Sequence, residues 1–214
     1  IFASICLISV FMLFTGCRNP GDWFYDRFID PVNYYISGTT EERKQLRRLF
    51  AEAEQNKGEH GNTLAVIQQI IKILHNSGNT EKLNLFLTAY VENNKEDPYN
   101  SYYLLAVAEN YRERGAYPFA THYYERILKN YPDLLVQGRS VHYTCLKQLV
   151  QMVEEPQTRV NYYKELIARF SEADNLYPEA DTVEKGPLYY YLSKTYEVFG
   201  EWELAIQAYR NFLL

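Results

Sequence analysis

A pattern of large, small and aromatic residues occurs twice in this 214-residue chain, at an offset of 85 residues. Each copy places apolar residues at helical spacing, then a glycine, and then a second stretch at the same spacing. The first copy holds Leu104, Val107, Ala108, Tyr111, Gly115, Ala120, Tyr124 and Pro132. The second copy holds Tyr189, Leu192, Ser193, Tyr196, Gly200, Ala205 and Tyr209. Self-similarity of this kind predicts an all-α stack of helical hairpins.

Small residues explain how the two helices of each copy can approach closely. Ala108 on the first helix is expected to face Ala120 on the second, and Ser193 is expected to face Ala205. Gly115 is expected to end the first helix, because glycine tolerates the positive φ angle found at many helix ends. Aromatic side chains then fill the gaps to neighbouring helices, which gives most of the 21 tyrosines of the chain a packing role.

These spacings resemble the tetratricopeptide repeat, a helix-turn-helix unit of about 34 residues. A weaker copy surrounds Gly78, and a further pair of apolar helices without the consensus is joined near Pro156. The resemblance implies a tetratricopeptide-type solenoid over residues 39–214, with hairpins near 62–94, 101–132, 139–171 and 187–214. An acidic stretch from Ser171 to Pro187 accounts for the extra length between the two clear copies. Because the chain stops at Leu214 within an apolar helical pattern, we expect a C-terminal truncation and further repeats.

The residues before the repeats divide into a lead segment and one amphipathic helix. Residues 17–38 are rich in aromatic side chains, so we expect them to pack on the first helices rather than to act only as a tether. Thr39 and Thr40 are followed by Glu41 and Glu42, which is typical of a helix start. Apolar residues then recur at helical spacing until Gly58.

The first 14 residues carry no charge and are followed by Thr15, Gly16 and Cys17. A helix of this length spans about 21 Å, which is shorter than the ~30 Å hydrocarbon core of a membrane. The stretch is therefore expected to be a cleaved export signal over residues 1–16.

The residues around Cys17 resemble the lipobox of bacterial lipoproteins, although Phe14 stands where that motif prefers leucine. The resemblance implies that Cys17 is the lipid attachment site, carrying palmitate or a similar acyl chain, and becomes the new N-terminus. The mature protein would then be anchored to a membrane of the bacterial cell envelope, on the periplasmic or surface side. Two alternatives stay open: Cys17 is an ordinary thiol behind a conventional signal peptide, or the segment is a truncated membrane anchor.

Charge and composition narrow the class of partner. The chain has 27 acidic and 22 basic residues, a net charge of −5, which is the wrong sign for a protein that neutralises phosphates. Nucleic acid is therefore not an expected partner. Three cysteines without a CxxC pair and four scattered histidines provide neither a disulfide framework nor a standard zinc spacing.

No motif for catalysis or cofactor binding occurs in the chain. His142 and Cys145 lie three residues apart on a predicted helix, a spacing that metal sites and thiol nucleophiles use. We interpret the pair as a buried thiol beside a partly exposed histidine, because no activating acid or second ligand can be assigned. We therefore expect no enzymatic activity, no cofactor and no metal.

The candidate binding residues lie on the first helix of each clear hairpin, at positions that the repeat does not use for its own core. A concave face lined by these side chains could hold an extended peptide through ring faces and hydrogen-bond donors. The residues assigned to this groove are Tyr102, Leu105, Glu109, Arg112, Tyr190 and Lys194. The alternative is that these side chains are solvated and have no partner. The Lys and Asn pattern with which some tetratricopeptide domains bind a terminal carboxylate is absent.

Together these features predict a non-catalytic, membrane-anchored scaffold that binds another envelope protein or peptide. The first alternative is an accessory lipoprotein of a transport or secretion system that binds a small solute or a transporter subunit. A regulatory subunit of a hydrolase is a third reading. The fold itself does not determine the partner, and the sequence leaves the oligomeric state open.

Overall fold

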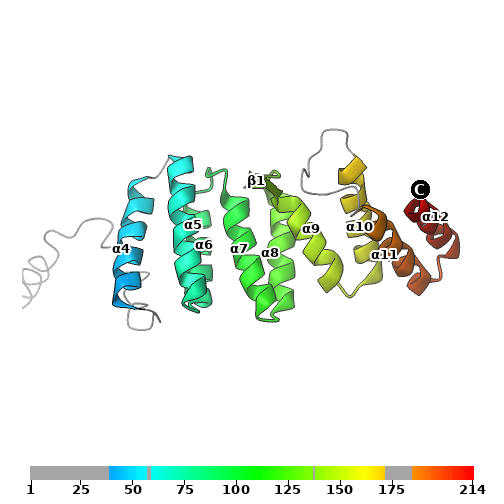
Figure 1. Cartoon of the computed structure of the whole chain (residues 1–214), viewed down its shortest axis with the longest axis horizontal. Helices are drawn as coiled ribbons and strands as arrows, with labels where there is room; N and C mark the ends of the chain where they lie inside the picture. Colours follow the sequence, from blue (N-terminus) through cyan, green and yellow to red (C-terminus); the bar gives the residue numbers. More distant parts are fainter. Residues whose placement is uncertain (1–38, 57–58, 137, 172–184) are drawn as a thin grey trace, which may run out of the picture. The chain divides into compact units, whose positions relative to one another are not determined.

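The computed structural model describes residues 39–56, 59–136, 138–171 and 185–214, and these residues are almost entirely helical (Figure 1). The helices are α4 (Thr40–Gln55), α5 (His60–Asn76), α6 (Thr80–Asn93), α7 (Asn100–Glu113), α8 (Tyr117–Asn130), α9 (Val141–Met152), α10 (Pro156–Ser171), α11 (Lys185–Phe199) and α12 (Trp202–Leu213). Two short strands, β1 (Leu135–Val136) and β2 (Arg139–Ser140), separate α8 from α9. The predicted all-α fold of helical hairpins is confirmed.

Several sequence-based expectations concern residues outside the described ranges. These are the export signal, Cys17, the aromatic lead segment up to residue 38, and most of the acidic stretch between α10 and α11. Among the residues that the structure describes, no helix is both long and apolar enough to cross a membrane.

The chain divides into two compact units, Ile1–Phe86 and Leu87–Leu214. In the first unit, α4 packs against α5. Thr39 and Glu42 form a capping box at the start of α4, in which the Glu42 amide donates to the Thr39 hydroxyl and the Glu42 carboxylate accepts from the Thr39 amide. The buried ring of Phe50 meets Phe86 edge to face, with centroids 4.8 Å apart.

In the second unit, each helix from α7 to α12 packs against the next helix in the chain. The first helix of one hairpin, α7, also packs against the first helix of the following hairpin, α9. This arrangement, in which each hairpin packs against the next, is that of a helical-repeat stack. The core of α9 to α12 is continuous and includes Leu146, Leu166, Leu192, Tyr196 and Ala205.

The small residues of the two hairpins are buried, as their spacing predicts. Ala108, Ala120 and Ser193 are fully buried, and Ala205 is nearly so. Gly115 and its counterpart Gly200 follow the first helix of their hairpins with φ angles of 72° and 73°. A residue with a Cβ atom would be strained in this conformation, so the glycines permit the tight turn between the two helices.

The connection from α8 to α9 contains a strand pair that the sequence reading missed. Leu135 pairs with Ser140, and Val136 pairs with Arg139, in antiparallel register. Asp133 stabilises this connection: its carboxylate accepts hydrogen bonds from the Ser140 hydroxyl at 2.7 Å and from the backbone amide of His142 at 2.9 Å. The Ser140 hydroxyl in turn caps α9 by accepting from the Tyr143 amide.

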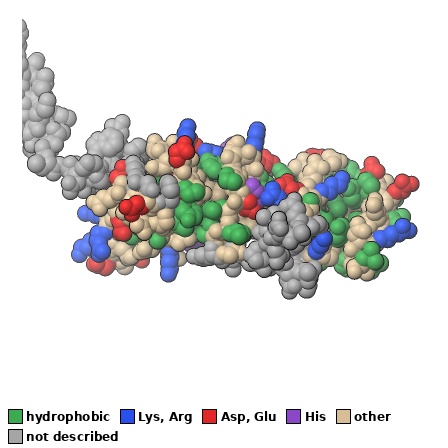
Figure 2. Space-filling model, turned by 90° about the horizontal axis from the view of Figure 1, so that it is seen from above, with side chains coloured by type: hydrophobic (Ala, Val, Ile, Leu, Met, Phe, Trp, Pro, Cys, Tyr) green, Lys and Arg blue, Asp and Glu red, His purple; other side chains and the backbone are tan. Residues whose placement is uncertain are grey.

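Apolar side chains are exposed at α11 and α12, the last two helices of the second unit (Figure 2). Trp202 at the start of α12 is 64% exposed, and Val198, Ile206 and Leu213 are more than half exposed. The inner face of α12 instead presents small side chains, Ala205 and Ala208, to the core.

The alanines at the hairpin contacts give a direct test of this packing. Ala120→Leu and Ala205→Leu should each lower the free energy of unfolding by about 1 to 3 kcal/mol, because a larger side chain overpacks a closed helix contact. Urea unfolding followed by circular dichroism measures the change. Ala168→Leu is the matched control, because Ala168 is exposed on α10; equal effects at all three positions would contradict the proposed contact.

Candidate binding face of the first helices

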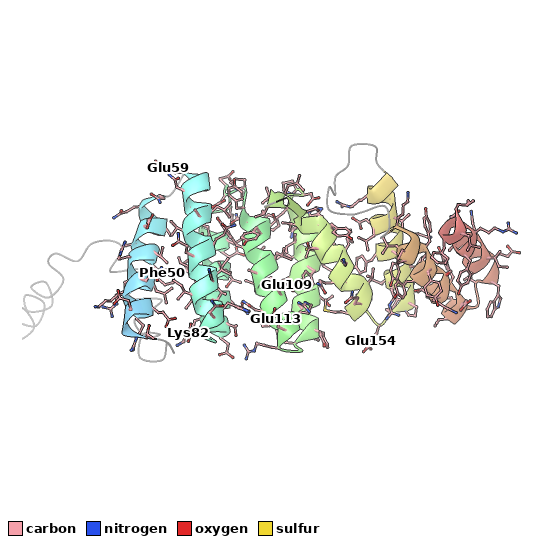
Figure 3. All side chains as sticks on the ribbon, in the orientation of Figure 1. Phe50, Glu59, Lys82, Glu109, Glu113 and Glu154 are labelled. Carbon is pink, nitrogen blue, oxygen red and sulfur yellow. The ribbon has the colours of Figure 1, made fainter. Side chains whose placement is uncertain are left out.

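The six residues assigned to a groove all lie outside the fully buried core. Tyr102, Leu105, Glu109 and Arg112 are half-buried on α7, whereas Tyr190 and Lys194 are exposed on α11. Figure 3 shows Glu109 and Glu113 on the same helix. Glu109 and Arg112 form an ion pair on α7. Tyr102 and Leu105 lie on the same helix, whereas Tyr190 and Lys194 lie on α11 in the last hairpin.

On α7, Glu109 connects the two helices of its hairpin. Its Oε1 atom accepts a hydrogen bond from the Tyr124 hydroxyl of α8 at 2.6 Å. Its Oε2 atom accepts from the Arg112 Nε atom at 2.9 Å and from Nη2 at 2.5 Å. One carboxylate therefore holds a cation on its own helix and a phenol on the next helix.

The last hairpin contains the same arrangement with the charges exchanged. The Tyr209 hydroxyl of α12 donates to Oε1 of Glu197 at 2.8 Å, and the Lys194 Nζ atom donates to Oε2 at 2.9 Å. Lys194 occupies the position of Glu109, and Glu197 that of Arg112, at the 85-residue offset that relates the two copies. We call each set of carboxylate, cation and phenol a hairpin tie.

The hydrogen bonds of the hairpin ties shift the pKa values of the residues that form them. Hydrogen bonding to Glu109 raises the pKa of Arg112, and hydrogen bonding to Glu197 raises the pKa of Lys194. Lys194 in turn lowers the pKa of Glu197 through the same bond. The pKa of Tyr124 is raised, first by burial and then by its bond to Glu109. All four groups therefore keep their usual protonation states at neutral pH.

Aromatic rings cluster around Tyr190, which is 38% exposed. Its ring lies 5.5 Å from Tyr191, 6.0 Å from Tyr209 and 5.7 Å from Phe212, measured between centroids. The Lys194 ammonium group is 6.0 Å from the centre of the Tyr190 ring. Tyr190 thus packs within its own hairpin while part of its ring faces solvent.

A pocket of about 540 Å³ opens between α9, α10 and α11. We call it the tyrosine pocket, because each of these helices contributes one tyrosine to its wall. It is lined by Tyr143, Lys147, Val150, Gln151, Tyr163, Leu166, Pro187, Leu188 and Tyr191. None of the six predicted groove residues lines this pocket.

The sequence does not predict the tyrosine pocket, because the hairpin of α9 and α10 lacks the repeat consensus. Its residues therefore could not be aligned with those of the other hairpins. A signal was nevertheless present. Tyr143, Lys147 and Gln151 follow one another at intervals of four residues, which places them on one face of α9. Within the structure, the Lys147 ammonium group lies 5.5 Å from the centre of the Tyr143 ring.

The pair of His142 and Cys145 is buried, and the expectation of a partly exposed histidine is wrong. Nε2 of His142 lies 2.9 Å from the Tyr131 carbonyl oxygen, and Nδ1 lies 3.1 Å from Nη1 of Arg169. Burial lowers the pKa of His142, so the ring is neutral, with Nε2 donating and Nδ1 accepting. Burial also raises the pKa of the Cys145 thiol, which disfavours the nucleophilic thiolate.

No cluster of three or more His, Cys, Asp or Glu side chains suited to a metal ion occurs in the described part of the chain. No protein family, no curated protein and no solved structure matches the chain.

The exchanged charges of the two hairpin ties lead to a reciprocal prediction. Glu109→Lys should lower the free energy of unfolding by about 1 to 3 kcal/mol, because the buried Tyr124 hydroxyl loses its acceptor. Adding Arg112→Glu should recover at least half of the loss, since this order of charges is the one found on α11.

Urea unfolding measures both variants, and Glu113→Lys, an exposed change on the same helix, is the control. If the double variant is less stable than Glu109→Lys alone, the two ties are not equivalent.

Proposed function

We propose that this protein is a tetratricopeptide-type scaffold of the bacterial cell envelope that binds another envelope protein or peptide. The assignment to this repeat class is supported by two observations beyond the sequence pattern. The small residues of each copy are buried, and the hairpin ties recur at the same 85-residue offset. Packing positions and polar contacts therefore follow one register.

The observation that carries the binding role is the surface of the first helices in the second unit. The tyrosine pocket opens between α9 and α11, with α10 contributing to its wall. Half-buried Tyr102 and Leu105 on α7 and exposed Tyr190 on α11 present further apolar area. Aromatic side chains on a rigid helical surface are the usual anchors of protein interfaces.

The residues that we assign to partner contacts differ in part from the six groove residues that the sequence predicts. Arg112 and Lys194 are engaged in hairpin ties, so we assign them to the stability of the hairpins. We assign partner contacts to Tyr102, Leu105 and Tyr190, together with the residues of the tyrosine pocket. Glu109 orients the face by holding α8 against α7.

We propose a binding rather than a catalytic role. The thiol of Cys145 is buried, and its pKa is raised. His142 has hydrogen-bond partners on both ring nitrogens. Neither group is presented at the tyrosine pocket.

The membrane anchor belongs to the same proposal and rests on the sequence around Cys17. Lipidation at this residue would place the helical repeats at a membrane surface, where two or three acyl chains give stable attachment. An envelope location fits a scaffold whose partner is itself an envelope protein or peptide.

A second candidate function is favoured by the volume of the tyrosine pocket. About 540 Å³ lies within the range of about 300 to 1,000 Å³ typical of small-molecule sites. The protein would then be an accessory lipoprotein of a transport or secretion system that holds a solute.

Site-specific photocrosslinking tests the scaffold. A photoreactive amino acid at Glu113 on α7 or at Gln151 on α9 should yield the same adduct from intact cells, because both positions are exposed on first helices. Placement at Lys129 on α8 or at Ala168 on α10, which are exposed on second helices, is the matched control. Mass spectrometry identifies the adduct; equal adducts from all four positions would contradict a specific binding face.

Metabolic labelling tests the anchor. Cells fed with labelled palmitate should incorporate it into the wild-type chain and not into Cys17→Ser, because the acyl chains attach through that cysteine. The variant should also leave the detergent phase in phase partitioning. Cys145→Ser is the control thiol change. Equal labelling of wild type and Cys17→Ser, or no labelling of either, would exclude this anchor.

A further inference from the structure

We propose that the exposed face of α12 binds a second copy of this chain, with the two α12 helices packed antiparallel about a two-fold axis. The face consists of Trp202, Ile206 and Leu213, which are flanked by Glu203 and Arg210. We call these five residues the α12 stripe. The inference goes beyond the scaffold function, because no residue of α12 is among those assigned to partner contacts.

The α12 stripe is turned away from the buried side of its helix. At 3.6 residues per turn, Trp202, Ile206 and Leu213 fall within about 40° of one another around the helix axis. Glu203 and Arg210 are seven residues apart, so they lie beside the apolar residues and two turns from each other. The two buried alanines of α12 pack into the core from the other side. The hairpin therefore does not use the α12 stripe for its own packing.

The corresponding face of α8 is covered by the hairpin that follows it. Leu128 of α8 packs against the core of α9 to α12, and the Tyr162 hydroxyl of α10 donates to Glu125 at 2.8 Å. Leu213 takes the place of Leu128 at the 85-residue offset, and it is 79% exposed. Arg210 takes the place of Glu125 and is also exposed. The positions through which α8 contacts its neighbour are thus uncovered on α12.

The α12 stripe is also more apolar than its counterpart on α8. Ile206 stands where α8 has Thr121, and Trp202 stands where α8 has Tyr117. Large apolar side chains that gather on a surface mark sites of contact with another protein. Tryptophan in particular is enriched among the residues that anchor such contacts. An occupant that covers these side chains removes them from water, which favours binding.

The charges of the α12 stripe favour a second copy as the occupant. Arg210 is positive where α8 has the acid Glu125, so a complementary occupant presents an anion at this place. α12 itself provides one, because Glu203 lies near the other end of the same stripe. When two α12 helices run antiparallel about an axis halfway between these two residues, Glu203 of each copy faces Arg210 of the other. One surface then supplies both halves of the contact, as an isologous interface requires.

The antiparallel order brings the apolar residues together as well. Trp202 begins α12 and Leu213 ends it, so the indole of each copy extends toward the leucine of the other. Ile206 lies close to the axis and meets the same residue of the second copy. Two ion pairs then flank an apolar centre, and this arrangement of a polar rim around an apolar core is the usual one in protein interfaces.

Charge reversal tests this contact in the full chain, with sedimentation equilibrium in density-matched detergent as the measurement. The wild-type chain should form dimers. Glu203→Arg and Arg210→Glu should each raise the dissociation constant of the dimer at least tenfold, because each places like charges opposite one another twice. An equimolar mixture of the two variants should recover dimers, since each chain then meets the opposite charges.

Two further variants complete the test. Ile206→Asp should also raise the dissociation constant at least tenfold, because it puts a charge at the apolar centre. Asn211→Glu, an exposed change on α12 outside the stripe, is the matched control and should leave the dissociation constant unchanged. All the substituted side chains are exposed, so the fold should be retained, and circular dichroism verifies this.

A photoreactive amino acid at Gln207, beside the proposed axis, should give an adduct between two copies in intact cells. An adduct with a different protein, or with another segment of the same chain, would assign the α12 stripe to that occupant and overturn the proposal. A monomeric wild-type chain, or a dimer that tolerates both charge reversals, would overturn it as well. These outcomes differ from failure of the scaffold, because partner adducts at Glu113 and Gln151 do not involve α12.

Discussion

The close approach of two antiparallel helices is the constraint on which the second unit depends. Ala108 and Ala120 are fully buried, as is Ser193 in the last hairpin, and α7 packs against α8 as α11 packs against α12. A hairpin of this kind cannot bury its remaining apolar side chains alone. It needs neighbours on both sides, which explains why α7 to α12 form a stack with continuous contacts between successive helices.

The hairpin ties add orientation to this packing. Helix contacts between small residues allow sliding, because alanine offers few directional interactions. A phenol on the second helix that donates to a carboxylate on the first fixes the rotation of one helix about the other, at Glu109 and again at Glu197. Tyrosine hydroxyls also bind carboxylates elsewhere, as Tyr162 does with Glu125 and Tyr90 with Asp97. This chemistry uses both the ring and the hydroxyl of a residue that is abundant here.

Features that depend on residues close together in the sequence could be predicted, whereas features that depend on distant residues could not. The positive φ angles of Gly115 and Gly200 and the buried alanines could be predicted, because backbone strain and helix spacing restrict those positions to a few residue types. Two-residue strands leave no periodicity, so the pair at Leu135–Val136 could not be predicted. The tyrosine pocket depends on the meeting of three helices, and its hairpin carries no consensus register. The burial of His142 likewise depends on Arg169, which lies 27 residues away in the sequence.

The last hairpin contains an intrinsic fluorophore, the indole of Trp202. Trp202 lies at the start of α12 and is 64% exposed, and the other tryptophan, Trp23, belongs to the aromatic lead segment. Tyr190, Tyr191 and Tyr209 cluster within the same hairpin as Trp202. The emission of an indole shifts with its exposure to solvent. Any partner, membrane surface or additional helix that covers α12 would therefore change the emission of Trp202 without an attached dye.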